Sequence, residues 1–353
     1  MNSKILFLIA LVLGAIGCNT IKPPSPPKVA AQELGTVVSE SDILGRAGGH
    51  SVSWQGRMLW LFGRTALSAP GLNGLPWLNS SAGWLERSAD ESTQWRLAEV
   101  ASGFNFVPLT VEESRYNRAH FTSEIPPGQR SCYLLTPGPA WTSEDGSRLC
   151  FLYRRELFGK EPEPEDRTGT GVMFWNDRAH QLKRGPILFD REDIHLGESA
   201  LRQGNMLYLY GCQQEKGKWV VRVGRVRIHQ FLDRDYWQFW NGTDWIFEAT
   251  EAKPAISDAG PELSVLWCAA LGHYVAFYLK GTTIECRVAV EPQGPWSPPV
   301  QVGQCLEGTA PPHSLVAHSE LEADGGRTQY LTYVRPAANG ASELCLLQIR
   351  FLP

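Results

Sequence analysis

The sequence lacks several features that would assign a chain to a common functional class. No cluster of Lys and Arg exceeds two or three residues and the net charge is −4, so the basic surface of a nucleic-acid-binding protein is missing. Beyond the N-terminus, no apolar segment approaches the ~20 residues of a transmembrane helix. No two cysteines form a Cys-x-x-Cys pair, which leaves thioredoxin-like and zinc-ribbon folds unsupported. We therefore expect no nucleic-acid partner and no cofactor.

Helical periodicity is also nearly absent after residue 35. Short runs of β-branched and aromatic residues alternate with turns of Gly, Asp, Asn or Pro, which is typical of strands. Apolar residues make up 43% of the chain and include 13 Trp, 10 Tyr and 14 Phe, enough for a large core. Because all-β folds often exceed the usual length of a single domain, residues 35–353 are predicted to form one all-β domain.

Seven cysteines follow position 18, so at least one of them is free or pairs between molecules. Most lie in apolar, strand-like contexts such as Leu-Trp-Cys268-Ala and Leu-Cys345-Leu-Leu. We expect buried, unreactive thiols rather than a full disulfide framework. If one bridge forms, the leading candidate pair is Cys132 with Cys150.

The first 18 residues have the organisation of a secretory signal. Lys4 precedes an apolar run from Ile5 to Ile16 that is too short to span a bilayer. The segment Ala15-Ile16-Gly17-Cys18 resembles a bacterial lipobox, in which the Cys thiol is acylated and becomes the new N-terminus. The resemblance implies a lipid anchor at Cys18, held by burial of its acyl chains. An ordinary signal peptide with an incidental cysteine is the alternative.

Residues 19–34 are rich in Pro and polar residues, which predicts a semi-rigid tether between anchor and domain. Asn19, rather than Asp, follows the cysteine. By resemblance to enteric lipoproteins, this favours the outer membrane over retention in the inner one. We therefore expect a protein of the bacterial cell envelope that contacts the membrane through its lipid.

One strand pattern recurs five times along the chain. A strand of small and apolar residues meets a tight polar turn and is followed by a more aromatic strand. The copies start at Ser51, Ser131, Glu198, Glu262 and Ser314, roughly 50 to 80 residues apart. That interval fits a four-stranded antiparallel sheet, and radial repetition of such sheets is a β-propeller. The sequence therefore predicts a five-bladed β-propeller; a β-sandwich with long loops is the alternative.

A ring of blades needs its first and last blades joined. We expect Gly35–Val38 to close the ring by pairing near Leu344–Phe351, since an unpaired edge strand would invite aggregation. The segment upstream of the closing strand would then be tether only.

The segment from Gly48 to Thr65, GGHSVSWQGRMLWLFGRT, resembles the opening of DUF4185-type domains, which typically contain Gly-Arg-x-Leu-Trp-Leu-Phe-Gly-Asp-Thr. Similar pieces follow in the family's order at residues 171–176, 199–212, 221–245, 262–279, 294–302 and 317–334, so the likeness runs from about residue 36 to 350. The resemblance implies a five-bladed propeller related in architecture to several glycoside hydrolase groups. Some such domains resemble or are glycosidases acting on furanose polymers such as arabinan, and most have no assigned activity.

This chain departs from the family pattern in its first unit. The Asp of Gly-Asp-Thr is Arg64 here, and residues 45–50, where the family has an upstream acid, contain no carboxylate. A glycosidase needs two carboxyl groups, and Arg cannot replace either because it stays protonated. If the family's Asp residues are catalytic, this copy has lost the chemistry of its first blade.

The remaining acidic candidates are Glu198 and Glu262, which begin the innermost strands of the third and fourth units. Because innermost strands line the channel of a propeller, the two could form a catalytic acid pair. The alternative is that each caps a strand or pairs with an Arg. Three further side chains are expected at the channel or its mouth as ligand-binding residues: His50, Arg64 and His318.

Aromatic faces stack on sugar rings, so Trp141, in the long turn of the second unit, is a further candidate ligand contact. Trp237, Trp240 and Trp245 are candidates of the same kind, with packing between blades as the alternative. His50, His195 and His318 come from different units and have no adjacent ligand motif, so we expect no metal site.

Two functions from different classes remain. The first is a propeller that binds a polysaccharide or oligosaccharide, with weak or lost glycosidase activity. The second is a non-catalytic envelope scaffold that binds another protein. The family resemblance favours the first and leaves open whether the protein is an enzyme.

Overall fold

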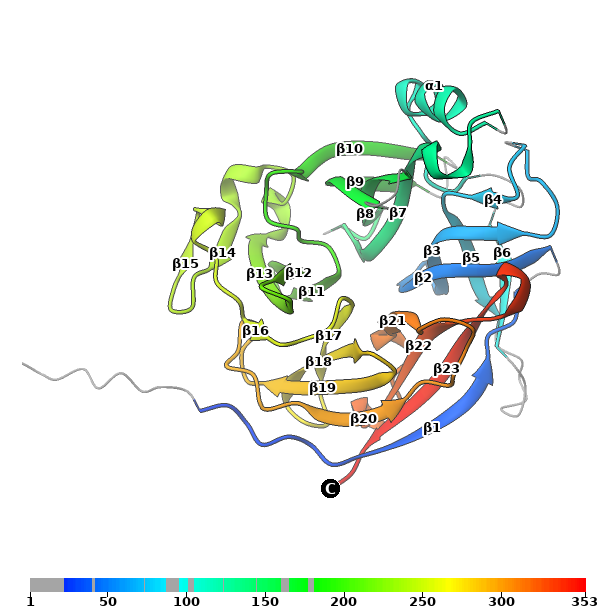
Figure 1. The fold of residues 1–353 in the computed structure, drawn as a ribbon. Helices are drawn as coiled ribbons and strands as arrows, with labels where there is room; N and C mark the ends of the chain where they lie inside the picture. The colour runs from blue at the N-terminus through cyan, green and yellow to red at the C-terminus, as the bar shows by residue number, and fades with distance from the viewer. Residues whose placement is uncertain are drawn as a thin grey trace, which may run out of the picture.

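The computed structural model describes residues 22–39, 42–72, 74–86, 95–100, 105–122, 124–143, 145–159, 165–176 and 181–353. Five antiparallel sheets surround a central axis, which confirms the predicted five-bladed β-propeller (Figure 1). The predicted signal segment and Cys18 lie outside the described residues. No helix within the described ranges is long and apolar enough to cross a membrane.

Each blade starts at the channel and adds strands outward. The first blade contains β2 (Ile43–Trp54), β3 (Arg57–Leu67), β5 (Ser81–Glu86) and β6 (Arg96–Glu99), with the short β4 (Trp77–Leu78) paired to β3. The second contains β7 (Ser131–Thr142), β8 (Leu149–Gly159), β9 (Glu165–Asn176) and β10 (Gln181–Asp190). The third contains β11 (Ser199–Gln203), β12 (Met206–Glu215), β13 (Lys218–Arg227), β14 (Gln238–Trp240) and β15 (Trp245–Ile246), with β16 (Ile256–Ser257) paired to β13.

The last two blades follow the same plan. The fourth contains β17 (Leu263–Cys268), β18 (His273–Lys280), β19 (Thr283–Ala289) and β20 (Val300–Gln304). The fifth contains β21 (His313–Ala317), β22 (Thr328–Pro336), β23 (Ser342–Phe351) and the N-terminal β1 (Val29–Thr36). Single-turn 3₁₀ helices lie in the connections, at Pro127–Gln129, Ile228–Gln230, Arg234–Tyr236, Ala249–Glu251, Ser319–Leu321, Asp324–Gly326 and Ala338–Gly340.

The five innermost strands are the small-residue strands of the repeated pattern, as predicted. They contact one another around the ring in the order β2, β7, β11, β17, β21 and back to β2. All five therefore start at the same end of the channel. Residues that begin these strands converge there although they are far apart in sequence.

Large apolar side chains fill the spaces between neighbouring blades. Burying one such side chain stabilises the fold by about 1.5–3 kcal/mol relative to leaving it exposed, so each interface contributes substantially. Every pair of adjacent blades has its own buried cluster. Each cluster has members from both of its blades; from the first interface round to the last, examples are Leu61 and Phe151, Leu152 and Leu209, Tyr210 and Tyr278, Phe277 and Phe351, and Trp60 and Val334.

The N-terminal segment closes the ring, as expected. Strand β1 pairs with β23 from Val29 opposite Phe351 to Thr36 opposite Cys345, along the outer edge of the fifth blade (Figure 1). The chain then crosses to the first blade, where the N–H of Val38 donates to the carbonyl of Trp95 at 2.8 Å. The strand begins at Val29, so the predicted tether boundary at residue 34 is too late. Residues 29–36 pair with the edge of β23 through backbone hydrogen bonds, which do not depend on the polarity of their side chains.

The seven cysteines of the described residues are free and buried, as favoured by their sequence contexts. The candidate bridge between Cys132 and Cys150 is wrong. Cys132 lies opposite Phe158 and Cys150 opposite Trp141, so the two thiols sit at opposite ends of the β7–β8 hairpin.

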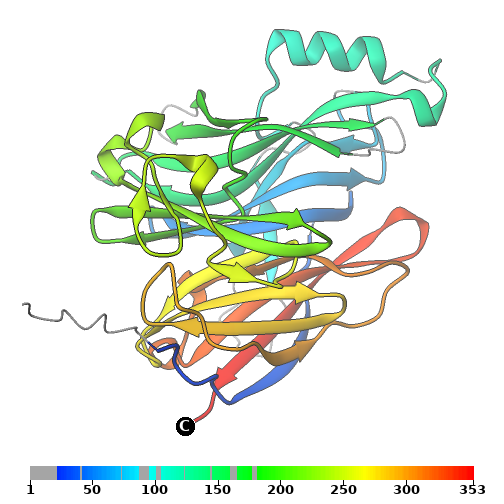
Figure 2. The same ribbon diagram turned by 60° about the vertical axis from the view of Figure 1, so that its left-hand side comes forward.

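Helix α1 (Val111–His120) is inserted between the first and second blades and projects beyond the sheets (Figure 2). It starts with a reciprocal cap, in which Thr110 Oγ1 accepts from the N–H of Glu113 and the Glu113 carboxylate accepts from the N–H of Thr110. Near the other end, Asn117 bonds both backbone groups of Tyr133 on β7. The helix is thereby docked on the second blade.

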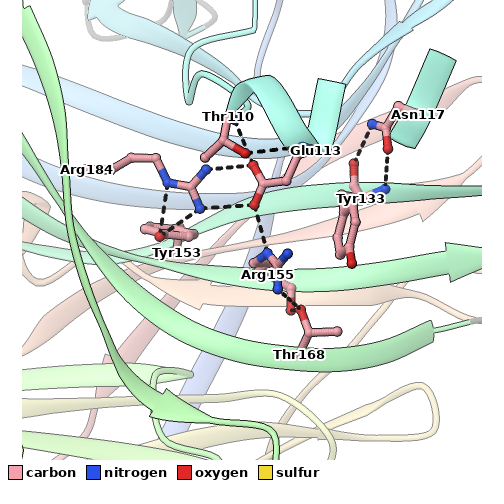
Figure 3. A network of polar contacts seen from close by, with 8 residues as sticks. All are labelled: Thr110, Glu113, Asn117, Tyr133, Tyr153, Arg155, Thr168 and Arg184. Atoms are coloured by element: carbon pink, nitrogen blue, oxygen red, sulfur yellow. Dashed lines mark hydrogen bonds and ion pairs between the residues drawn. The ribbon is translucent and has the colours of Figure 1, made fainter. Parts of the chain in front are cut away.

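The buried carboxylate of Glu113 ties this helix to three strands of the second blade (Figure 3). Arg184 from β10 donates to it at 2.6 and 3.2 Å, and Arg155 from β8 donates at 2.7 Å. Arg184 also bonds the Tyr153 hydroxyl, and Arg155 bonds Thr168 of β9. Burial alone would raise the pKa of Glu113, but the Arg184, Thr110 and Arg155 hydrogen bonds outweigh it and lower that pKa.

We predict that ring closure depends on β1. A chain that starts at Lys28 should melt at the same temperature as one that starts at Lys22, because residues 22–27 belong to no strand. A chain that starts at Val37 loses the whole β1–β23 ladder and exposes the edge of β23. Its melting temperature should fall by at least about 5 °C. Equal melting of the two shortened chains by calorimetry would show that β1 is dispensable.

Candidate functional site

A hollow of about 680 Å³ opens between the first, second and fifth blades, at the end of the channel where the innermost strands start. We call this hollow the funnel. Its wall is mixed in character, with aromatic side chains, basic groups and stretches of small residues. The residues that shape it most are Arg46, Arg64, Trp77, Phe121, Phe158 and His313, with the segment 336–342 on the fifth-blade side.

Arg64 lies on β3 in the funnel wall, as predicted for the mouth of the channel. Its side chain is exposed and its Cζ lies 5.4 Å from the centre of the Phe158 ring. The neighbouring residues fix the backbone here. A Cβ on Gly63 would approach Thr136 Cγ2 to 2.8 Å, so only glycine allows the first and second blades to come this close. Thr65 is fully buried and bonds Ser81 Oγ at 2.7 Å.

Trp77 and Phe121 form an aromatic pair on the same wall. Their ring centres lie 5.6 Å apart and the rings are nearly perpendicular, at 86°. Trp77 belongs to β4, and Phe121 is the residue at the C-terminal cap of α1. The Glu113 network therefore holds one wall of the funnel in place through the helix.

Below the funnel lies a smaller cavity of about 80 Å³, which we call the channel cavity. Residues from all five blades line it, and it shares Ala47 with the funnel. Glu198, Glu262 and His50 line this cavity together, as the strand pattern predicted. Their catalytic and ligand-binding roles stay predictions.

Glu198 is held as a carboxylate by two arginines. Arg154 Nη1 lies 2.8 Å from Glu198 Oε1, and Arg167 Nη1 lies 3.7 Å from the same atom. Burial alone would raise the pKa of Glu198, but the two guanidinium groups outweigh it and lower that pKa. The expected alternative, pairing with Arg, therefore applies to Glu198, and the partners are Arg154 and Arg167.

The pKa of Glu262 is shifted in the opposite direction. Burial raises its pKa, and the charge of Glu198 adds to this shift, although the N–H groups of Ser314 and Leu315 oppose it. The Leu315 N–H donates to Glu262 Oε2 at 2.9 Å. Ser314 has a positive φ of 59°, which belongs to the turned backbone that presents these donors. The two carboxyl groups thus have pKa values shifted in opposite directions, as acid and base in a catalytic pair would.

A second, smaller channel cavity of about 60 Å³ adjoins the first, and His50 lines both. Burial lowers the pKa of His50 to about 4, so the ring is neutral at pH 7. The second cavity contains a carboxylate that the sequence pattern missed. Glu320 accepts a hydrogen bond from Ser51 Oγ at 2.9 Å. It lies after the innermost strand of the last blade, where our pattern placed only His318.

The expectation that His318 contacts a ligand is wrong for this structure. The ring is fully buried, stacks on Trp60 at 4.2 Å, and has both nitrogens occupied. Nδ1 lies 2.8 Å from Ser51 Oγ and Nε2 lies 2.8 Å from Thr332 Oγ1. Burial lowers its pKa to about 3. His318 is a core residue between the last and first blades.

Trp141 is not brought to the funnel either. It lies near the opposite end of β7, is 5% exposed, and packs edge-on against Phe231 at 5.3 Å. It lines a separate hollow between the second and third blades, where its ligand role remains untested. Trp237 is fully buried and donates to the carbonyl of Phe231 at 3.0 Å, so packing explains it. Among the described residues, no three His, Cys, Asp or Glu side chains are arranged to hold a metal.

The two cavities differ in what they can accommodate. Ligand pockets usually measure about 300–1,000 Å³, a range that includes the funnel. The channel cavity, about 80 Å³, has room for a few waters at roughly 30 Å³ each. A ligand can therefore enter the funnel, whereas the carboxyl pair lies beneath it in a cavity that is too small to hold a sugar ring.

Comparisons with known proteins support the propeller and its family. A family model described as "Domain of unknown function (DUF4185)" matches residues 172–348, half of the chain. A proposed hydrolase from Bacteroides ovatus has a similar structure over 90% of this chain and 87% of its own, with a TM-score of 0.62 and 11% identity. No curated protein matches the sequence.

Two further solved structures are glycoside hydrolases. A family 117 enzyme from Zobellia galactanivorans has a TM-score of 0.56 and 10% identity, with 92% of this chain and 90% of that chain covered. An α-L-arabinofuranosidase from Podospora anserina has a TM-score of 0.50 and 10% identity, with coverages of 93% and 98%. At such low identities, what these proteins share with this chain is the fold.

We predict that Glu198 supports stability more than Glu262 does. Glu198→Gln removes the anion shared by the largely buried Arg167 and the partly exposed Arg154, although Arg154 keeps Glu156, and this should cost about 1–3 kcal/mol at pH 7 in urea unfolding. Glu262→Gln keeps an oxygen for the backbone donors and should cost less than about 1 kcal/mol.

The pH dependence gives an independent check on this prediction. Because the folded pKa of Glu198 is lowered, its contribution is present above the unfolded pKa and is lost as the pH falls through the folded one. The gap between wild type and Glu198→Gln should therefore shrink in acid. Equal costs for both variants at pH 7 would show that Glu198 and its arginines are not coupled.

Proposed function

Because the chain belongs to the DUF4185 family, we propose that it is a carbohydrate-binding propeller of the bacterial envelope, with little or no hydrolytic activity. The ligand occupies the funnel. Trp77, Phe121 and Phe158 supply apolar ring faces, and Arg64 and His313 supply polar groups beside them. The glycoside hydrolase propellers among the structural neighbours are consistent with a carbohydrate ligand.

The observation that carries this proposal is the separation of funnel and carboxyl pair. The funnel is large enough for an oligosaccharide and is lined by ring faces, whereas the carboxyl groups lie in a cavity for water. A glycosidase holds its two carboxyl groups on either side of the scissile bond, about 5–9.5 Å apart. Here Glu198 is engaged by Arg154, and the first blade offers Ala47 and Arg64 instead of acids.

The envelope location rests on the N-terminal sequence. A lipid at Cys18 would hold the propeller at a membrane, with the residues before Val29 as a short tether. Asn19 favours the outer membrane.

The binding proposal predicts retention of the protein on insoluble polysaccharide without release of sugar. Trp77→Ala and Phe121→Ala should each weaken retention by at least about tenfold, since stacking faces are removed. Trp267→Ala is the matched control, because Trp267 is 44% exposed on β17 and does not line the funnel. Reducing sugar released in step with protein concentration would show an active glycosidase. No retention on any of a broad set of polysaccharides would favour the protein-binding scaffold.

The anchor proposal predicts that Cys18→Ser releases the protein from membranes. The variant lacks the thiol that would carry the acyl chains, so it should move to the soluble fraction of the envelope. Wild type should require detergent for release. If both proteins fractionate with membranes in the same way, Cys18 is not the anchor.

A further inference from the structure

The funnel wall carries positive groups and lacks negative ones. Its basic side chains are Arg46, Arg64 and His313, burial raises the pKa of its one thiol, Cys132, and none of its described residues is an Asp or Glu. This is unusual for a pocket in a chain whose net charge is −4. This excess of positive groups can affect a ligand only if at least one of them is able to contact it.

Arg46 is not available. Its side chain is buried beneath the wall, forms an ion pair with Glu99, and lies over the Phe62 ring at 4.5 Å. His313 is half-buried, and burial together with the charge of Arg64 lowers its pKa. These two residues therefore add little positive charge to the space inside the funnel at neutral pH.

Arg64 is available. It is exposed, its Cζ lies over the Phe158 ring at 5.4 Å from the ring centre, and no carboxylate of the described residues lies within ion-pair distance of it. Stacking on an aromatic face leaves the edge of the guanidinium free. That edge presents N–H donors in a planar fork that matches the oxygens of a carboxylate or a sulfate.

The carboxyl groups beneath the funnel do not cancel this charge. Glu198 and Glu156 both pair with Arg154, Arg167 Nη1 lies 3.7 Å from Glu198 Oε1, and Glu262 Oε2 accepts from the N–H of Leu315 at 2.9 Å. An anion in the funnel would therefore lie near Arg64, which has no carboxylate partner among the described residues. Beneath it, the charge of Glu198 is offset by Arg154 and Arg167.

From this arrangement we propose that the sugar bound in the funnel is anionic, carrying a carboxylate or a sulfate ester that Arg64 grips through its N–H fork. The inference rests on the proposed carbohydrate-binding function and names its ligand class. The Phe158 face holds the guanidinium in place, and the Trp77–Phe121 pair packs on the sugar ring.

The test compares charged polysaccharides with neutral counterparts of the same backbone. Polygalacturonate is paired with its carboxyl-reduced form, and a sulfated galactan is paired with its desulfated form. Wild type should bind at least one charged polymer about tenfold or more tightly than its neutral partner, and added salt should reduce the difference. The pair that shows the preference identifies the acidic group.

Variants of Arg64 assign the effect. Arg64→Gln should remove most of the preference for the charged polymer, and Arg64→Lys should keep part of it because the charge remains without the fork. Arg57→Gln is the matched control. Arg57 lies on the same strand, is exposed, and stacks on Trp84 at 3.9 Å, but it does not line the funnel. Unchanged melting temperatures would show that the variants fold.

The outcomes separate this inference from the function on which it rests. Equal binding to charged and neutral partners, weakened by Trp77→Ala, would overturn the anionic ligand and leave carbohydrate binding in place. A charge preference that survives in Arg64→Gln, or that Arg57→Gln also abolishes, would overturn the role of Arg64. Absence of binding to every polymer would overturn both proposals.

Discussion

Strand β1 joins the last blade to the first, and the geometry of the whole channel depends on that closure. Once the ring is closed, each innermost strand must start at the same end of one axis. Glu198 and Glu262 are 64 positions apart in sequence, and His50 is further still, yet they line one cavity. The closing strand itself is mostly exposed and has no fully buried residue, so backbone hydrogen bonds to β23 hold it rather than core burial. The channel cavity, which all five blades line, thus depends on the β1–β23 pairing, and β1 lies outside the five repeated units.

Two carboxylates in this protein, Glu113 and Glu198, hold neighbouring arginines in place. Glu113 and Glu198 each sit between two arginines, and in both cases the guanidinium groups lower a pKa that burial would raise. Removing one member of such a cluster leaves the other charges without a partner. The resulting loss of folding free energy is larger than the stability that the intact cluster adds relative to apolar residues of the same size. Glu113 thereby fixes the helix that ends at Phe121, and Glu198 fixes Arg154 in the channel wall. The shape of the funnel and the charge of its floor follow from these two clusters.

Sequence alone predicted the parts of the site that follow from strand register. The starts of the innermost strands placed Glu198, Glu262 and His50 together, and the end of β3 placed Arg64 at the mouth. The prediction from sequence failed for side chains that lie outside the regular strands. His318 follows the last residue of β21, and the turn directs its ring into the core instead of the channel. Helix α1 was missed because its apolar face is weak, although Thr110-x-x-Glu113 has the spacing of a capping box. The Trp77–Phe121 contact joins two loop-borne elements and leaves no periodic signal.

Two arginines, Arg154 and Arg64, affect the chemistry of the channel and of the funnel in related ways. A hydrolase needs the reacting bond between its carboxyl groups, and each oxygen that an arginine engages is less able to accept a proton or attack carbon. Arg154 does this to Glu198 in the channel, while Arg64 places a cation in the wall of the funnel. The residues at the starts and ends of the inner strands therefore set two properties together: which carboxyl groups are free of arginine, and which charges face the funnel.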